Sequence, residues 1–291
     1  MIPAQFDYVR PPNIGEALRI LKDREGEAKV LSGGYSLIPL LKLRLAEPGL
    51  LVDIRDLDGL DRIVETDDDL RIGARATHRK LHESALIRDR YPLFHDAAGG
   101  IGDPQVRNWG TIGGSVAHAD PSSDWPAVLL ATMATLVCRS AAGERRIAAR
   151  SFFLDTFVTA IEATEILTEI RIPRPNGRTG GAYQKIERRA GDFATAGAAV
   201  AVQLGSDGRI ARAGVGLTAV AETPFAATDA EAVLAGGAPS EELYRRAGAA
   251  AAAQSRPMSD SHGPAEYKQA MAAEMTVRAL RRAVARARGE G

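Results

Sequence analysis

The sequence predicts an α+β protein of two domains, and three observations support this class. Its 291 residues are about twice the typical domain length. Strand and helix patterns are mixed up to residue 172, and a segment rich in proline and glycine at 173–181 is typical of a linker. An antiparallel hairpin and helical segments follow. We therefore expect one domain over 1–177 and a smaller one over 178–291.

The first helix and the first two strands are predicted from a capping motif and from the pattern of apolar residues. Asn13, with Glu16 three residues later, forms a capping box before an apolar stripe, which predicts a helix that ends near Gly26. Residues 28–31 form a short strand that runs into two glycines, and 50–54 form a second strand. This part of the chain therefore mixes strands with helices.

The next stretch predicts a strand pair and two helices. Strands at 63–65 and 70–74 flank an acidic turn, Thr77 caps a helix, and Pro92 begins another that runs into the glycine-rich segment at 99–104.

Further along, Asp124 can cap a helix with Pro126 in its first turn, and strands follow at 135–139 and 144–147. Residues 165–172 alternate, which predicts a strand. The side chains expected on one face of it are Ile166, Thr168, Ile170 and Ile172.

The C-terminal domain is predicted from one turn and its helix-forming composition. Residues 195–204 and 209–220 flank the sequence GSDG, which is typical of an antiparallel hairpin. Segments rich in Ala, Glu and Arg predict helices. These helices are expected at 229–234, 240–254 and 264–288. The arginines of the last one are expected to form a solvated face, with docking of a partner as the alternative.

Composition excludes several functions. With 37 basic and 37 acidic side chains, the chain has no cationic excess for nucleic acid, so no nucleic-acid partner is expected. The single cysteine, Cys138, excludes a disulfide framework and an iron–sulfur cluster held by this chain alone. His78 and His82 are four residues apart without further ligands, so we interpret them as a helix surface rather than a metal site.

The N-terminal sequence has neither a secretory signal pattern nor a run of about 18 apolar residues. We therefore expect a cytoplasmic chain.

The first candidate site is the segment KVLSGGYSLIPLLK at 29–42. A strand ends at Gly33 and Gly34, Ser36 can cap the following helix, and Pro39 falls at its third position. Glycines allow close approach of an anion, and a helix N-terminus favours negative charge. A plain strand-to-helix turn is the alternative, and the glycine pair alone favours it.

A second glycine pair lies in the segment 109–124, beside the hydroxyls of Thr111 and Ser115 and before the carboxylate of Asp124. Asp124 as a simple N-cap is the alternative. Two such loops favour one extended ligand held at two places, although neither matches a Rossmann or phosphate-loop motif. No nucleophile and base stand out, and Cys138 lies in an apolar strand, so the chemistry is expected to belong to a cofactor.

Four ordered motifs carry a resemblance to a known family. Residues 32–44, SGGYSLIPLLKLR, resemble the AGGHSLLPxxKLR segment of the flavin-binding medium subunits of molybdenum hydroxylases. Residues 111–115 and 119–124, TIGGS and ADPSSD, are similar to the TIGG…ADPxxD segment of the same family, and the similarity continues through 165–173 and 185–195.

The resemblance implies FAD as the cofactor and an FAD-binding domain of the vanillyl-alcohol oxidase type (PCMH type). That domain would have subdomains at about 1–57 and 58–177, with a smaller C-terminal domain of antiparallel sheet and helices behind it. It implies no catalytic residue and no metal ligand on this chain. The positions that match the family's cofactor-binding residues are Leu31, Ser32, Gly33, Gly34, Tyr35, Ser36, Leu37, Ile101, Thr111, Gly114, Ser115, Asp124, Leu167, Lys185 and Phe193.

Within this set the resemblance implies distinct roles. The main chain from Leu31 to Leu37 would hold the diphosphate, with a second wall from the second loop. Asp124 would bind toward the adenosine side, and Lys185 would lie at the pyrimidine end of the isoalloxazine. Phe193 stands where relatives usually have a tyrosine covering the ring.

The remaining positions would pack near the cofactor, Ile101 against the flavin and Leu167 beside it. Tyr35 replaces the usual histidine of the first loop, which leaves the main-chain donors in place.

The implied function is electron transfer in a multi-subunit oxidoreductase. FAD would receive electrons from a small iron–sulfur subunit, after a large molybdopterin-binding subunit has oxidised the substrate, and would pass them to quinone, oxygen or NAD. A dimer of heterotrimers is expected, with any association with the inner face of the membrane made through the partners. Similarity along the chain favours the carbon monoxide dehydrogenase branch. The alternatives are hydroxylases of the nicotine, caffeine, aldehyde or xanthine type, a stand-alone FAD oxidase, and a flavin-free scaffold.

Overall fold

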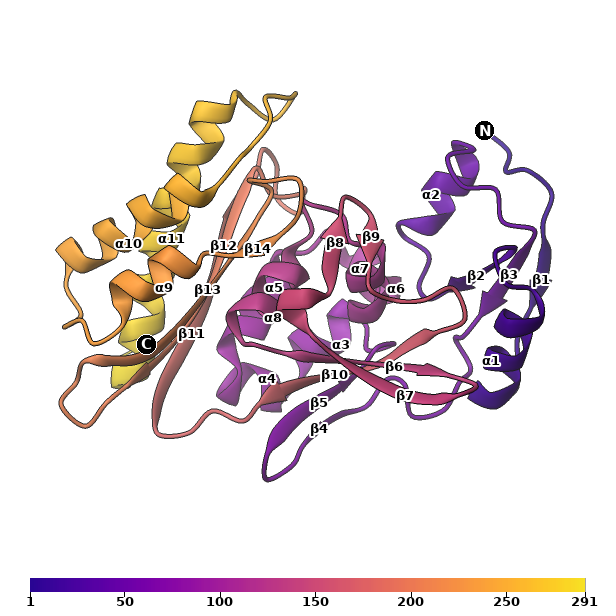
Figure 1. The fold of residues 1–291 in the computed structure, drawn as a ribbon, viewed down its shortest axis with the longest axis horizontal. Helices are drawn as coiled ribbons and strands as arrows, with labels where there is room; N and C mark the ends of the chain where they lie inside the picture. The colour runs from indigo at the N-terminus through magenta and orange to yellow at the C-terminus, as the bar shows by residue number, and fades with distance from the viewer. Residues whose placement is uncertain (291) are drawn as a thin grey trace.

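The computed structural model describes residues 1–290, and its sheets follow one another from the N-terminal end to the C-terminal end of the molecule (Figure 1). A small parallel sheet with two helices comes first, a five-stranded sheet with a group of helices lies in the middle, and a four-stranded sheet with three helices lies at the other end. The α+β prediction is confirmed.

The first sheet has the strand order β1-β3-β2, and both pairs are parallel. Its elements are β1 (Asp7–Val9), α1 (Ile14–Asp23), β2 (Ala28–Leu31), α2 (Leu37–Lys42) and β3 (Leu50–Asp53). Helix α1 begins as predicted, because the Oδ1 atom of Asn13 accepts a hydrogen bond from the main-chain N–H of Glu16 at 2.9 Å. The Glu16 carboxylate pairs with Arg19 instead of completing the capping box.

This cap leads to a first prediction. Asn13→Ala removes the acceptor and leaves one N–H of the first turn without its partner, so we expect the free energy of unfolding to fall by about 1 kcal/mol. Urea denaturation measures the loss. Asn13→Ser, which keeps an acceptor at the N-cap, should retain most of the stability, and equal losses in both variants would contradict the capping argument.

The central sheet is antiparallel in every pair and has the order β4-β5-β10-β6-β7. Its strands are β4 (Ile63–Glu65), β5 (Asp69–Gly73), β6 (Thr135–Ser140), β7 (Gly143–Ala148) and β10 (Ile166–Pro173). Its helices are α3 (His78–Glu83), α4 (Ala85–Arg90), α5 (Pro92–Gly100), α6 (Pro104–Trp109), α7 (Ile112–His118) and α8 (Asp124–Ala131). The short turn η1 (Ala149–Ser151) and the two-stranded ribbon of β8 (Phe153–Asp155) and β9 (Val158–Thr159) complete this part.

Strand β10 departs from the simple alternation that the sequence predicts. Its register shifts between Leu167 and Glu169, and Leu167 is buried in the same core as Ile170. Ile166 packs instead in the core of the first sheet. The bulge therefore makes one strand serve two cores, and the predicted single face is wrong at Ile166.

The C-terminal sheet has the order β11-β12-β13-β14 and is antiparallel. Its elements are β11 (Arg178–Ile186), β12 (Ala196–Leu204), β13 (Ile210–Thr218), β14 (Phe225–Ala226), α9 (Thr228–Leu234), α10 (Glu241–Gln254) and α11 (Ala265–Arg288). Both faces are covered. Ala182 faces the core shared with α11, whereas the neighbouring Tyr183 faces the core shared with α5 and α8.

Strand β11 begins inside the segment that we interpreted as a linker. Only residues 174–177 lie between β10 and β11. Gly180, in β11, serves close packing, since a Cβ atom there would lie 2.0 Å from the carbonyl oxygen of Ala283 in α11.

An ion pair fastens α11 to the central domain. The guanidinium of Arg286 donates to both carboxylate oxygens of Asp96 in α5, at 2.7 and 3.0 Å, and to the carbonyl oxygen of Gly181. The expectation that the arginines of the last helix form only a solvated face is therefore wrong for Arg286.

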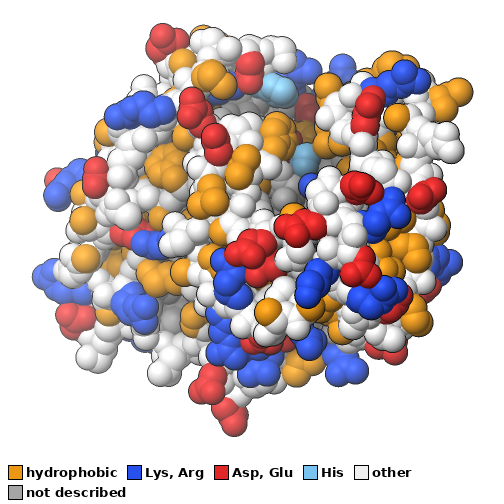
Figure 2. Space-filling model, turned by 45° about the vertical axis from the view of Figure 1, so that its right-hand side comes forward, with side chains coloured by type: hydrophobic (Ala, Val, Ile, Leu, Met, Phe, Trp, Pro, Cys, Tyr) orange, Lys and Arg blue, Asp and Glu red, His pale blue; other side chains and the backbone are white. Residues whose placement is uncertain are grey.

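The surface carries charges of both signs. On the face shown in Figure 2, basic and acidic side chains are interspersed, in keeping with the net charge of zero. Among residues 1–290, no helix combines the length and apolar composition needed to cross a bilayer.

Candidate functional site

The first glycine loop joins β2 to α2 through two residues in the left-handed region, Gly33 at φ +74° and Gly34 at φ +90°. Ser36 stands at the N-cap position with helical dihedral angles and no side-chain hydrogen bond to the helix, so the predicted capping by Ser36 is wrong. Pro39 is the third residue of α2, as predicted.

This loop carries main-chain donors that are not used inside the protein. Within residues 1–290, the N–H groups of Gly33, Tyr35, Ser36 and Leu37 donate no hydrogen bond, whereas that of Gly34 donates to the carbonyl of Ser32. Unused N–H groups at the start of a helix are suited to an anion. The loop can therefore bind a phosphate group without a cationic side chain.

The second loop differs because most of it is helical. Thr111 is the N-cap of α7, and its Oγ1 accepts from the N–H of Gly114 at 3.1 Å. The N–H groups of Ile112, Gly113 and Ser115 are all used, because they donate to the carbonyl oxygens of Ala76, Ala74 and Thr111, respectively. The second loop can therefore contribute side-chain hydroxyl groups to a ligand, whereas the unused main-chain N–H groups belong to the first loop.

The two loops lie against each other, as the prediction of one shared ligand requires. The hydroxyl oxygens of Ser32 and Thr111 are 3.0 Å apart. A Cβ atom on Gly114 would lie 2.9 Å from the carbonyl oxygen of Ser32. One helical turn further, the hydroxyl oxygen of Ser115 is 2.6 Å from that of Ser123, so a line of hydroxyls leads from the first loop toward Asp124.

Asp124 is not an N-cap. Ser123 holds that position in α8, and the Asp124 carboxylate is directed at the C-terminal sheet. Its Oδ1 accepts a hydrogen bond of 2.5 Å from the hydroxyl of Tyr183 and lies 3.3 Å from the Nζ atom of Lys185. Nζ of Lys185 is also 2.9 Å from Oε2 of Glu187 and donates to the carbonyl of Asp192.

This buried cluster has unusual electrostatics. Burial raises the pKa of Asp124 above its ordinary value, although the nearby ammonium of Lys185 acts in the opposite direction. Burial and the Asp124 carboxylate together raise the pKa of Tyr183 well above 10. Lys185 thus lies between two carboxylates, and Tyr183 stays a hydrogen-bond donor.

The cluster brings two predicted residues together. Asp124 was predicted to bind toward the adenosine side of the ligand and Lys185 to lie at the flavin ring, and the charged groups of the two side chains are 3.3 Å apart.

Two other predicted residues lie near Lys185. Ile101 follows α5, and the next residue, Gly102, is so close to Gly191 that a Cβ there would lie 2.5 Å from the Gly102 carbonyl oxygen. Phe193 follows on the same loop as Gly191, and its side chain is 51% exposed. The structure therefore brings Ile101, Lys185 and Phe193 to one region.

The other predicted positions differ in exposure. Leu31 and Leu37 pack in a small core beneath the first loop, whereas Tyr35 is exposed. Leu167 is only 6% exposed and lies inside the central core, below α7 rather than on the surface of the site.

Tyr183 belongs to this buried cluster, although it was not among the residues predicted for the site. The signal was available, because Tyr183 and Lys185 are two residues apart on one strand and therefore share a face. His78 was expected on a helix surface, which is wrong. His78 is buried, accepts a hydrogen bond from Nε1 of Trp125, and its pKa is lowered to about 4 by burial.

Cys138 is fully buried in β6, and burial raises the pKa of its thiol to about 12, as expected for an inert core cysteine. Among residues 1–290, no three His, Cys, Asp or Glu side chains are grouped closely enough to hold a metal ion.

Comparisons with known proteins agree with this geometry. Residues 4–175 match the family described as the FAD binding domain in molybdopterin dehydrogenase, and residues 181–283 match the CO dehydrogenase flavoprotein C-terminal domain. The chain is 43% identical to the carbon monoxide dehydrogenase medium chain of Afipia carboxidovorans, covering 99% of this chain and 100% of the relative. It is 38% identical to the 6-hydroxypseudooxynicotine dehydrogenase complex subunit alpha of Paenarthrobacter nicotinovorans, over 99% of this chain and 97% of that protein.

Among solved structures, carbon monoxide dehydrogenase from Hydrogenophaga pseudoflava superposes with a TM-score of 0.95 at 43% identity, covering 98% of this chain and 99% of the matched chain.

Proposed function

The chain belongs to the family of FAD-binding domains in molybdopterin dehydrogenases, and on this premise we propose that it is the FAD-binding electron-transfer subunit of a molybdenum hydroxylase of the carbon monoxide dehydrogenase type. Its relatives also include a caffeine dehydrogenase subunit beta and a nicotine 6-hydroxylase medium subunit. The substrate of the complex is chosen by another subunit.

The observation that carries this proposal is the set of unused N–H groups in the first loop. The residues fit the diphosphate of FAD, because Gly33 has no room for a side chain and the loop directs uncompensated donors at the start of α2. A Cβ on Gly33 would lie 2.3 Å from the carbonyl oxygen of Trp109. Thr111 and Ser115 supply hydroxyls on the opposite side.

When bound, FAD supplies the redox chemistry, taking electrons from iron–sulfur centres of a partner and giving them to an external acceptor. The residues of this chain hold and orient the cofactor. Lys185, fixed between Asp124 and Glu187, would lie at the flavin end, where the two carboxylates compensate its positive charge. Phe193, exposed on its loop, is suited to cover an aromatic ring.

The partners follow from the same proposal. A large molybdopterin-binding subunit oxidises the substrate, and a small iron–sulfur subunit relays the electrons. We propose a dimer of such heterotrimers in the cytoplasm, with quinone, oxygen or NAD as the acceptor. Any attachment to the inner face of the membrane is made by the partners.

The proposal is tested by purifying the chain alone and with its partners. We expect a yellow chain that carries one FAD. The substrate of the complex should reduce this FAD only when the molybdenum and iron–sulfur subunits are present. A colourless chain that does not take up FAD would contradict the proposal. Bleaching of the isolated chain by a small alcohol or aldehyde would instead show a self-contained oxidase.

A further inference from the structure

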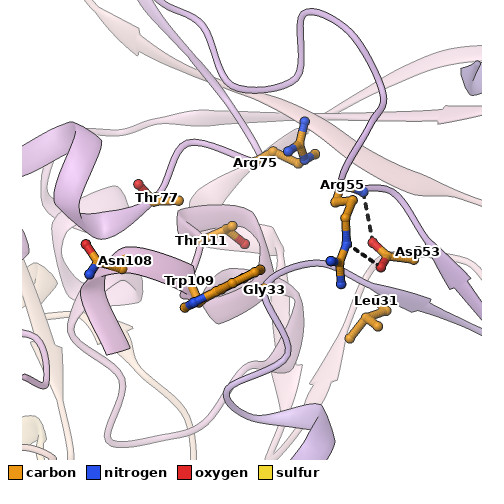
Figure 3. A pocket seen from close by; sticks show the side chains of 9 residues that line it. All are labelled: Leu31, Gly33, Asp53, Arg55, Arg75, Thr77, Asn108, Trp109 and Thr111. Atoms are coloured by element: carbon orange, nitrogen blue, oxygen red, sulfur yellow. Dashed lines mark hydrogen bonds and ion pairs between the residues drawn. The ribbon is translucent and has the colours of Figure 1, made fainter. Parts of the chain in front are cut away.

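The structure contains a cavity that lies apart from the two glycine loops. This interdomain cavity measures about 340 Å³ and lies between the central domain and the C-terminal domain. Its walls come from α8, η1 and β8 on one side and from residues 223–228, at β14 and the start of α9, on the other (Figure 1). The cavity in Figure 3 is a different one, because Gly33 and Thr111 line it and it belongs to the site described above.

The size and position of the interdomain cavity are typical of a small-molecule site. Sites for drug-sized ligands measure roughly 300–1,000 Å³ and occur preferentially at domain interfaces. A cavity of roughly 150 Å³ admits benzene. With about 340 Å³, the interdomain cavity therefore has room for one ring that carries a short side chain.

Two contacts between the domains fix the walls of this cavity. The guanidinium of Arg150 in η1 pairs with Glu231 in α9. The hydroxyl of Thr156, in the turn between β8 and β9, donates to the carbonyl oxygen of Glu222 at 2.9 Å. Because these contacts exist without a ligand, binding does not have to move the domains, which lowers its cost.

Most of the lining is apolar and is held from behind. Leu130 and Pro224 are buried. Phe153 packs against the central core and Phe225 against the C-terminal core, and each is only partly buried. Since both rings also line the cavity, they offer fixed aromatic surface to an apolar ligand.

Arg150 is the one charged residue in the lining as far as residues 1–290 describe it. Its side chain is 31% exposed, and in the same part of the chain only its Nη2 donates a hydrogen bond, to Oε1 of Glu231. That oxygen also accepts from the main-chain N–H of Val215 at 2.9 Å. Glu231 offsets part of the charge of Arg150, but the N–H groups on Nε and Nη1 stay available, and a guanidinium edge of this kind favours a carboxylate.

A hydroxyl group adds a second donor. The hydroxyl oxygen of Thr228 accepts from the side-chain amide of Gln254 at 3.2 Å, which leaves its hydrogen for a ligand. The polar groups of the cavity are thus suited to acceptor oxygens, and the rest of the lining is suited to an apolar body.

We propose that the interdomain cavity binds a small monocarboxylic acid with an apolar body of ring size. The carboxylate accepts hydrogen bonds from Arg150, and the body lies between Phe153 and Phe225. This inference does not depend on the proposed function. An acidic side chain of a partner protein has the same chemistry, and the experiment separates the two sources.

Phenylacetate is the probe, titrated into the FAD-loaded full chain so that the cofactor site is already filled. We expect a dissociation constant of roughly 1 mM or lower. A tenfold excess over this value should raise the midpoint of thermal unfolding by roughly 2–4 °C. Phenylacetamide has the same size without the charge and should bind roughly 10-fold more weakly. Equal affinities for the acid and the amide would overturn the proposal.

Arg150→Gln should weaken phenylacetate binding by roughly 10-fold and leave phenylacetamide binding nearly unchanged, so the amide also reports whether the cavity is intact. Arg150→Lys should keep part of the preference for the acid. Arg146→Gln, on β7 and with a side chain that is 61% exposed, is the matched control and should change neither affinity. An unchanged ratio of the two affinities in Arg150→Gln would show that Arg150 does not hold the carboxylate.

Thr223→Trp places an indole in the cavity and should abolish binding of both compounds. Ser206→Trp, exposed in the turn between β12 and β13, should abolish neither. Wild-type affinities in Thr223→Trp would place the bound acid elsewhere and overturn the proposal. If the wild-type chain bound neither compound, and Thr223→Trp no longer co-purified with the partner subunits, the cavity would hold a partner segment and the proposal of a small acid would be wrong. Should the chain bind no FAD, the proposed function would fail, and the comparison of Thr223→Trp with wild type would still test this inference.

Discussion

Gly33→Asp should yield a folded chain without FAD. The new carboxylate would lie among the unused N–H groups of the first loop and repel the diphosphate, and its Cβ would meet the carbonyl oxygen of Trp109 at 2.3 Å. Loss of two hydrogen bonds to charged oxygens corresponds to roughly 3–6 kcal/mol, or at least about a 100-fold weaker affinity. Visible flavin absorbance per mole of purified chain measures the effect.

The matched control is Gly26→Asp. Gly26 has a similar φ of +80°, and no atom lies within 4 Å of a Cβ built there. It therefore reproduces the backbone strain, about 1–2 kcal/mol, and the added charge without touching the site. The FAD content of Gly33→Ala shows how much of the loss comes from the bulk of the new side chain and how much from its charge. Full FAD content in Gly33→Asp would show that the first loop does not hold the diphosphate.

Lys185→Met should destabilise the flavin-free chain by roughly 3–5 kcal/mol near neutral pH. Asp124 and Glu187 would then lose the ammonium that lies 3.3 and 2.9 Å from them, and Asp124 has little access to water. Urea denaturation of wild type and variant, both freed of flavin so that ligand binding does not contribute, gives the difference.

The loss should depend on pH in a definite direction. The pKa of Asp124 is already raised by burial, and removal of the neighbouring ammonium raises it further. A carboxyl whose folded pKa exceeds its unfolded pKa stabilises the fold fully below the unfolded value, and this contribution is lost as pH rises through the folded value. The destabilisation by Lys185→Met should therefore be smallest in mild acid and grow toward neutral pH.

The double variant Asp124→Asn with Lys185→Met provides the check. It removes one charge of each sign while Tyr183 keeps a hydrogen-bond acceptor, so most of the lost stability should return. If the two single losses simply added, or if the loss in Lys185→Met did not change with pH, the buried ion pair would not be the cause.

Much of the fold could be predicted because its signals are local. The cap at Asn13, the strand at 28–31 and the hairpin of β12 and β13 follow from capping, alternation and turn composition. Helix α7 could not be predicted in this way, because Gly113 and Gly114 each cost about 1 kcal/mol of helix propensity. Tertiary packing requires glycine at this position of the helix, since a Cβ on Gly113 would lie 2.5 Å from the Cβ of Ala74.

The site was predictable only in part. The family motifs predicted which residues belong to it, but they did not indicate that Asp124 and Lys185 form a pair, because that contact joins α8 of the central domain to the C-terminal sheet. The first part of β11 was hidden for a similar reason. Gly180 and Gly181 have the composition of a linker, but packing requires both to be small, Gly180 because α11 approaches it and Gly181 because Leu93 of α5 does.

The buried cluster of Asp124, Tyr183 and Lys185, which we propose for the flavin end, also draws on both domains. Tyr183 and Lys185 come from the C-terminal sheet, whereas Asp124 comes from the helices of the central domain. Neither half alone contains the complete set of groups. If FAD binds as proposed, its retention will report on the docking of the C-terminal domain against the central domain. A protease cut within 174–177 should then release FAD only if the two fragments separate.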